Sequence, residues 1–511
     1  MINSKSTKSR ERYLLKFFIS GFVITVTVIA LILFTDIPLG VPDDWQWMRL
    51  KHPHIPLVET SMAAGLFCFS LLLSLFVDCK LAKIKYKLKL FLSLLIIMLT
   101  LPFNYYILHS GRAGILENVI AVTDHWSTGY LSQASKIKHF KMFLQNYNKI
   151  LSIDADESNH TDVHPPGNTA FSFFMIQVAK FVIPLPVYEW EKLHVKKVVN
   201  FSGSYSKEAI ISDQLYVDAA FLIVFIFLAS ISASNFILFF AIRNLSNGMD
   251  APGLIALSFF AVPAPVLFLG LYDTLYYFLT SITCLLFSYF IKFSKKKSQK
   301  RYCYTILTSM GIWLGFCTLF SIGFFVVLFM ILIFLFVNLK LKTNKRLISE
   351  ISCLLVGFIF FIGLVYCVNI KLIDIYYFCS RNNSRFFEQN KRSLIWIIVN
   401  YLDYALFVGG ISISAIFYYL RQFTWKKKSY IIDFTLAYTI TLIIVSATGF
   451  SRGEMGRLLL LFIPFNTVIA GYMLNTSNKP GIIYVLKLLT LFALLWQIII
   501  IRSYLKIVLY F

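Results

Sequence analysis

Long apolar runs, separated by short clusters of basic residues, dominate the chain. The first three lie at about 17–35, 59–77 and 90–108, and each is long enough to cross about 30 Å of hydrocarbon as a helix. Inside a bilayer the backbone must satisfy its own hydrogen bonds, so such runs have to be helical. With 58% hydrophobic and 14% charged residues, the composition lies far from that of a soluble domain. The sequence therefore predicts an all-α polytopic membrane protein.

The remaining apolar runs bring the prediction to about 11–13 transmembrane helices in a single domain, 1–511. They lie at about 168–186, 215–241, 253–271, 274–292, 302–320, 322–338, 347–368, 394–420, 430–449, 457–474 and 480–501. Four of them lie between a long polar loop, which is expected outside, and the basic cluster at 292–301, which is expected in the cytoplasm. Segments on opposite sides of a membrane must be separated by an odd number of crossings. We therefore expect one of the four, the run after His164, to be re-entrant or too short.

The net charge of +23 comes from lysines and arginines in these inter-run clusters. The positive-inside rule assigns such clusters to the cytoplasm, and their pattern argues against nucleic-acid binding. The first run has no cleavage pattern and is predicted to be a retained helix. The eight cysteines show no CxxC pairing, so neither a disulfide framework nor a zinc site is indicated. We expect an integral protein of a bacterial cytoplasmic (inner) membrane, with its site facing the outside or periplasm.

Three outer loops follow from this topology, at 36–58, 109–168 and 369–393. The stretch 126–151 of the long loop places apolar residues at helical spacing, with lysines at the other positions. This pattern predicts amphipathic helices lying on the bilayer surface.

The long loop ends in His164-Pro165-Pro166-Gly167, a stiff turn that precedes an apolar run. Each proline lacks a backbone N–H and restrains the residue before it to extended geometry. The imidazole of His164 is therefore expected on a rigid turn at the membrane surface.

Four acids are candidate catalytic or binding residues, because charged groups near outer helix ends are scarce in such a chain. Asp43 and Asp44 follow the first run, Asp124 opens the long loop, and Asp273 lies between two runs. For the first three the alternative is a solvated turn with tryptophans as interfacial anchors. For Asp273 the alternative is a helix cap for Thr274 onward.

Cationic and metal-binding groups are also predicted in the outer loops. No cofactor is certain, but His125, His160 and His164 are candidate ligands of a divalent metal ion. Arg452 and Arg457, with Glu454 between them, form either a structural ion pair or a phosphate clamp, which suits the planar fork of arginine.

Together these groups suit transfer from a lipid phosphate. A carboxylate takes the proton of an acceptor hydroxyl, and cations stabilise the departing phosphate. The candidate donor-phosphate residues are His164, Asp273, Arg385, Arg452, Glu454 and Arg457.

The chain resembles the GT-C superfamily of integral membrane glycosyltransferases, and is similar to the branch of protein O-mannosyltransferases and aminoarabinose transferases. The resemblance rests on the order of its motifs, each of which is weak alone. They are Asp43-Asp44-Trp45, Asp124 with Tyr130 and Ala134, His164-Pro165-Pro166, the isolated Asp273, and Arg452 to Arg457 before Pro464.

This resemblance implies a loop aspartate as catalytic base and a sugar donor on dolichyl or undecaprenyl phosphate. The acceptor would be a glycan, a lipid or a protein. The chain departs from the family because two extra helices separate Asp43 and Asp44 from the His-Pro-Pro loop, so the base is either Asp44 or Asp124. His164 stands where some branches have lysine.

Two other functions remain open. One is a transporter or flippase of a lipid-linked saccharide, although the sequence shows no obvious internal repeat or mid-helix charge. The other is neighbouring chemistry, such as an O-antigen polymerase or ligase, or the fold without activity.

Overall fold

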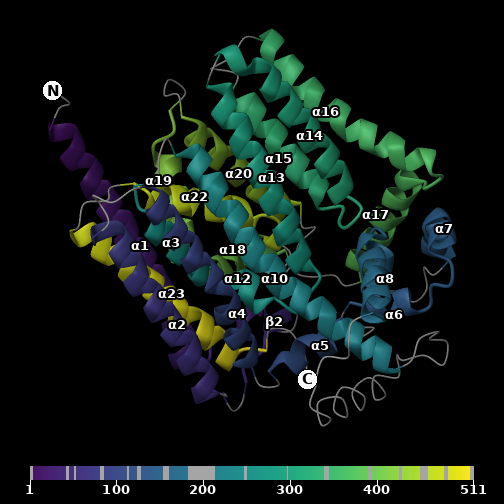
Figure 1. Cartoon of the computed structure of the whole chain (residues 1–511), viewed down its shortest axis with the longest axis horizontal. Coiled ribbons are helices and arrows are strands. Elements are labelled where there is room, and N and C mark those ends of the chain that lie inside the picture. Colours follow the sequence, from purple (N-terminus) through teal and green to yellow (C-terminus); the bar gives the residue numbers. More distant parts are fainter. Residues whose placement is uncertain are drawn as a thin grey trace.

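The computed structural model of the chain is almost wholly helical (Figure 1). It describes residues 4–41, 45–50, 53, 55–80, 86–111, 114–123, 128–153, 160–181, 213–246, 250–295, 297–338, 344–389, 394–424, 429–448, 459–476 and 481–506. The only sheet among these residues is a hairpin of β1 (Leu39–Val41) and β2 (Trp45–Trp47). The all-α class predicted from the apolar runs is therefore confirmed.

Eight helices among the described residues are long and apolar enough to cross a membrane, which makes the chain a polytopic membrane protein. They are α1 (Ser4–Phe34), α2 (Leu57–Leu75, extended by the π-helical turn η1, Phe76–Lys80), the pair α3 (Tyr86–Met98) and α4 (Thr100–His109), α10 (Asp213–Leu245), α13 (Asp273–Ser294), α16 (Asn344–Cys367), α20 (Tyr430–Ala447) and α23 (Ile482–Tyr504).

Other predicted spans are broken or short. The run at 394–420 was expected to be one helix, but it is two, α18 (Trp396–Val408) and α19 (Gly410–Arg421), bent by 116° at Gly409. The remaining helices of the bundle are α11 (Pro252–Ser258), η4 (Phe259–Ala261), α12 (Pro263–Leu267), η5 (Lys297–Gln299), α14 (Lys300–Cys317), α15 (Phe324–Val337), η7 (Leu459–Leu461) and α22 (Ile463–Leu474).

Basic side chains gather at one end of the bundle, where several helices begin or end. Five contacts define this basic end: Arg421 over the Tyr13 ring at 4.7 Å, Arg243 over the Tyr86 ring at 5.4 Å, Lys295 over the Tyr430 ring at 6.0 Å, Lys292 Nζ to Asn244 Oδ1 at 3.2 Å, and Arg346 Nη2 to the Ser294 carbonyl at 3.4 Å. The clusters predicted to share one side of the membrane thus lie together.

The conflict in the count of crossings is explained by α8 (Gly167–Ala179), the run after His164. Its 13 residues extend about 20 Å, which is too short to cross the hydrocarbon region. The next described helices make three passes. The helix α10 ends at the basic end. The broken segment 252–267 leads from there towards the opposite end, and α13 returns to the basic end.

Small elements gather at the opposite end of the bundle, which we call the far end. They are the hairpin, α5 (Ile115–Thr123), α6 (Tyr130–Ser135), α7 (Phe140–Ile153), η3 (His160–Val163) and α17 (Leu372–Gln389). Figure 1 shows α6, α7, α8 and α17 together at the right of the molecule, away from the N-terminus.

Two of these elements refine the predicted loops. The amphipathic helix expected within 126–151 is α7, but part of its apolar side packs on protein. Phe140 stacks on Phe173 of α8 at 4.9 Å, and Tyr147 packs against Leu372 of α17. Most of the predicted outer loop 369–393 forms the helix α17.

The helices α14 and α16 cross very closely because glycines face the partner backbone. A β-carbon on Gly311 would lie 2.0 Å from the Leu354 carbonyl oxygen, and one on Gly357 would lie 2.1 Å from that of Thr308. Small residues at helix crossings let two membrane helices approach and gain van der Waals contact.

We expect Gly357→Ala to lower the free energy of unfolding by about 1–3 kcal/mol, because the added carbon forces α14 and α16 apart. The matched control is Gly363→Ala on the same helix, where an added β-carbon meets nothing within 4 Å. Alanine is the better helix former by up to ~1 kcal/mol, so the control should be neutral or stabilising. Thermal unfolding in detergent measures both, and equal midpoints would contradict the close-crossing argument.

Candidate active site

The His-Pro-Pro turn is held by hydrogen bonds from the layer of short helices. It connects η3 to α8, and Pro166 occupies the position before the first helical residue. The hydroxyl of Tyr147, on α7, donates to the carbonyl oxygens of Thr161 at 3.3 Å and His164 at 3.1 Å. The predicted rigid turn is thus fixed on its loop side as well as by its own prolines.

A second anchor lies on the membrane side of the turn. The amide of Gly167 donates to the Leu319 carbonyl at 2.7 Å, in the turn between α14 and α15. A β-carbon at Gly167 would lie 2.5 Å from that oxygen, so the position requires glycine. The same turn bonds α13 through Tyr276 and α17 through Tyr376, whose hydroxyls reach Phe320 and Thr318.

Aromatic rings connect His164 to the start of α13. The His164 ring lies edge-on to Tyr130 with centroids 5.8 Å apart, and Tyr130 lies edge-on to Tyr272 at 4.7 Å. The Tyr272 hydroxyl is 2.6 Å from that of Ser172 on α8. This chain of contacts brings His164 near Asp273, the residue that follows Tyr272.

The Tyr130 phenol remains protonated in this setting. Burial raises its pKa well above the usual value, and the nearby Tyr276 and Asp273 raise it further, against the hydrogen bond with Asn168. Burial also raises the pKa of Tyr272. Both rings therefore offer neutral hydroxyls as hydrogen-bond donors, not phenolates.

Asp273 is the first residue of α13, where its carboxylate is half-buried. The N-cap position belongs to Tyr272, whose side chain makes no capping hydrogen bond. Asp273 therefore stands in the first turn, where an acid complements the helix dipole.

The buried polar layer beside this turn was not predicted from the sequence. The Asn168 amide donates to the Tyr276 hydroxyl at 2.8 Å, and the Thr169 hydroxyl donates to Gln133 Oε1 at 2.6 Å. These residues come from three segments of the chain, α6, α8 and α13. Polar residues inside apolar runs were the available signal, but only the fold shows that they meet.

Asp124 and His125 lie outside the described residues, but their flanks are placed. Thr123 ends α5, and its carbonyl accepts from the Tyr216 hydroxyl of α10 at 2.9 Å. On the other flank, the Thr128 hydroxyl donates to the Ala121 carbonyl at 3.2 Å. Both threonines are buried.

Asp43 and Asp44 also lie outside the described residues, between the paired strand ends Val41 and Trp45. Close by, Trp47 Nε1 donates to Asp403 Oδ1 at 2.5 Å. Asp403 is a buried acid of α18, six residues before the bend at Gly409, and was not among the residues predicted from the sequence. Its indole contact fixes the hairpin to the broken helix pair.

The end of α23 attaches to both aspartate segments. Arg502 Nη2 lies 2.8 Å from Glu117 Oε2 of α5, and both side chains are largely buried. The Leu50 amide, just after the hairpin, donates to the Tyr504 carbonyl at 2.8 Å. Glu117 and Leu50, which lie seven and six residues along the chain from the candidate bases Asp124 and Asp44, therefore both contact the end of α23.

The other predicted groups are only partly described. Arg385 is exposed on α17. Arg452, Glu454 and Arg457 lie outside the described residues, as does the His160 side chain. Across the described ranges, no three His, Cys, Asp or Glu side chains gather as metal ligands.

Comparison of the chain with protein-family models, with curated proteins and with solved structures gave no match. The function has to be argued from the site itself.

We expect Arg502→Met to destabilise the protein by about 3–5 kcal/mol, because it leaves the Glu117 carboxylate buried without its ion-pair partner. Glu117→Gln in the Arg502→Met background should restore much of that loss, since the uncompensated charge is then removed. Thermal unfolding of the single and double variants in detergent measures the coupling.

The control for this pair is Arg385→Met, an exposed arginine whose replacement should change stability by no more than about 0.5 kcal/mol. If the stability losses of Arg502→Met and Glu117→Gln simply add, so that the double variant shows no recovery, the ion-pair interpretation is contradicted.

Proposed function

We propose that the protein is a membrane glycosyltransferase that moves a sugar from a polyprenyl-phosphate donor to an acceptor at the far end of the bundle. One observation carries the proposal. Leu50 and Glu117, each within seven residues of a candidate base, contact the end of α23, and the hairpin, α5 and the His164 turn all belong to the far end. The acceptor is a glycan, a lipid or a protein, and the membrane is the bacterial cytoplasmic membrane.

In the proposed reaction, Asp44 or Asp124 accepts the proton of an acceptor hydroxyl. The hydroxyl oxygen attacks the anomeric carbon of the donor sugar. The bond from that carbon to the phosphate oxygen breaks, and its electron pair leaves with the polyprenyl phosphate. Cationic and hydrogen-bonding groups around His164 stabilise that leaving group. Arg385, Arg452 and Arg457, with Glu454, are the further candidates for this role.

The surface of α8 supports access for a lipid-linked donor. Directly beyond the His164 turn, Phe174 and Val178 are exposed, and Phe181 is 88% exposed. Exposed apolar side chains beside a helix too short to cross the membrane suit contact with an isoprenoid chain at the level of the bilayer.

One observation favours a second candidate, a transporter of a lipid-linked saccharide. Broken helices with buried polar groups mark the binding sites of many transporters. Here the bend at Gly409 lies near Asp403, and the Tyr404 hydroxyl contacts Tyr438 and accepts from Asn466 at 2.8 Å. In the assay below, flipping of a labelled lipid without sugar transfer would favour this candidate.

The proposed orientation places the basic end in the cytoplasm and the far end outside, as the positive-inside rule predicts. Two exposed native cysteines lie at opposite ends, Cys79 beside the basic end and Cys367 at the last residue of α16. In variants that retain only one cysteine, a membrane-impermeant maleimide should label Cys367 in intact cells and Cys79 only after permeabilisation. The reverse labelling would contradict the orientation.

We expect Asp44→Asn or Asp124→Asn, whichever residue is the base, to reduce transfer by about 10²–10⁴-fold, because the acceptor proton loses its carboxylate. His164→Ala should reduce transfer by about a hundredfold or more if the ring stabilises the leaving phosphate. The measurement is transfer of labelled sugar in membranes supplied with polyprenyl-phosphate sugars. The same assay in the presence of a chelator tests the alternative in which His125, His160 and His164 bind a divalent metal ion.

Matched controls for this assay are Asp36→Asn, an exposed acid of the first outer loop, and His139→Ala, an exposed histidine of the long loop. Both should transfer like the wild type. Full transfer by both aspartate variants would overturn the role of a loop carboxylate, and no transfer from any donor would overturn the transferase.

A further inference from the structure

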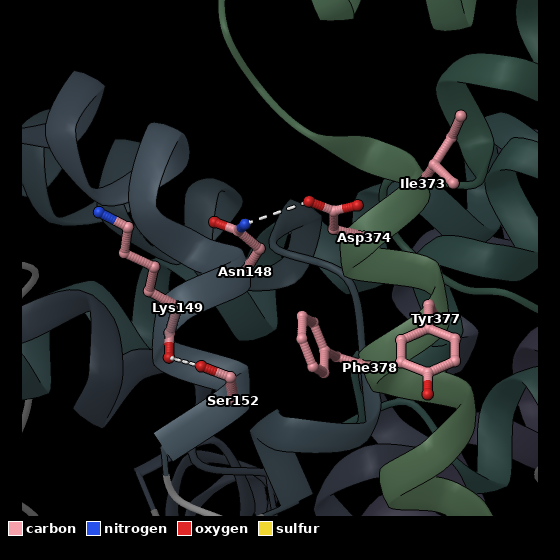
Figure 2. A pocket seen from close by; sticks show the side chains of 7 residues that line it. All are labelled: Asn148, Lys149, Ser152, Ile373, Asp374, Tyr377 and Phe378. Carbon is pink, nitrogen blue, oxygen red and sulfur yellow. Dashed lines mark hydrogen bonds between the residues drawn. The ribbon is translucent and has the colours of Figure 1, made fainter.

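An open groove of about 520 Å³ lies between α7 and α17 (Figure 2). Its lining residues come from the long loop and from the loop predicted at 369–393. They are Asn148, Lys149, Ser152, Ile373, Asp374, Tyr377 and Phe378. The groove therefore exists only because two segments more than 200 residues apart form helices that pack together.

The groove combines an aromatic surface with paired polar groups. Tyr377 is 63% exposed, and its ring lies edge-on to Phe378 at 5.5 Å. On the upper side in Figure 2, the Asn148 amide donates to Asp374 Oδ2 at 3.4 Å. Sugar rings present both apolar C–H faces, which suit aromatic rings, and hydroxyls, which suit carboxylate and amide groups.

The charge of the groove selects among saccharides. Asp374 faces Asn148 across the groove, whereas Figure 2 shows the Lys149 side chain pointing away from α17. The Asp374 carboxylate repels the carboxylate of a uronic acid bound against it and accepts hydrogen bonds from neutral hydroxyls, while Lys149, the cation among the lining residues, lies on α7. Neutral sugars therefore fit better than acidic ones.

The two helices cover part of each other's apolar sides. Tyr147 and Leu151 of α7 pack against Leu372, Ile375 and Cys379 of α17 in a small separate core. The groove opens beside this core, and its polar pair makes it a poor site for an acyl chain.

The groove also lies next to the His164 turn. Tyr147, the neighbour of Asn148, donates to the His164 carbonyl from the same helix. On α17, the Asn382 amide donates to the carbonyls of Leu151 and Asp162 at 3.3 and 3.2 Å. The groove and the turn are thus parts of one hydrogen-bonded unit.

We propose that the α7–α17 groove binds a neutral saccharide, with Tyr377 as the stacking surface and Asp374 as the hydroxyl acceptor. In the proposed transferase this saccharide is the acceptor glycan, and that assignment rests on the proposed function. Saccharide binding itself does not rest on it.

The test uses the full-length protein, fluorescently labelled in detergent, on immobilised oligosaccharides of two to six units. The array carries hexose, N-acetylhexosamine and uronic-acid series. Wild-type protein should bind at least one neutral series more strongly than the acidic one. Tyr377→Ala and Asp374→Asn should each weaken that binding by about tenfold or more, because Tyr377 is exposed and neither change disturbs the small core.

The matched control is Tyr302→Ala, a tyrosine of similar exposure near the basic end, which should bind like the wild type. Absence of binding to every series, equal loss in the control, or preference for the acidic series would overturn the proposal. A different result would identify the groove as a membrane-contact surface and overturn the proposal. In that case the groove variants would lose co-sedimentation with phosphatidylglycerol vesicles but would still bind saccharide.

Failure of saccharide binding and failure of sugar transfer can be distinguished by experiment. Asp44→Asn and Asp124→Asn should still bind the saccharide, because the described lining of the groove comes from α7 and α17 and neither residue belongs to these helices. Binding without any transfer would retain the groove and reject the transferase. Transfer that is insensitive to Tyr377→Ala would retain the transferase and reject the groove as its acceptor site.

Discussion

The far end of the molecule depends on one buried ion pair, between Arg502 and Glu117. Taking two charges out of water is costly, so such a pair persists only where geometry and further hydrogen bonds compensate for that loss. Arg502 also reaches the Leu108 carbonyl, and the backbone beside it bonds to the segment after the hairpin. Through these contacts one helix end sets the positions of α5, α4 and the first outer loop.

A layer of neutral phenols and amides makes the His164 turn specific. Tyr147, Tyr130, Tyr272 and Tyr276 each make a directed contact around it. A phenol satisfies hydrogen bonds without carrying charge into a low-dielectric region, where an unpaired ion would be costly. The layer therefore holds a polar site at the level of the bilayer without a matching set of buried ions.

The fold class and the stiffness of the His-Pro-Pro turn could be predicted from sequence, because both follow from local chemistry: apolar length and proline geometry. The bend at Gly409 was missed, although the Gly409-Gly410 pair inside the apolar run is a local signal for a break. The Arg502–Glu117 pair and the Asn168–Tyr276 bond join residues 385 and 108 positions apart. Only the tertiary fold brings such residues together, and local pattern carries no information about them.

The separation of 385 residues between Glu117 and Arg502 has a consequence for the order of assembly. Synthesis runs from the N-terminus at roughly 5–20 residues per second, so Glu117 precedes its partner by about 20–80 seconds. During that interval α5 holds an acid whose final partner does not yet exist. The site at the far end can therefore be completed only after the ribosome has delivered α23, and a nascent chain released earlier would carry an unfinished site in an already inserted bundle.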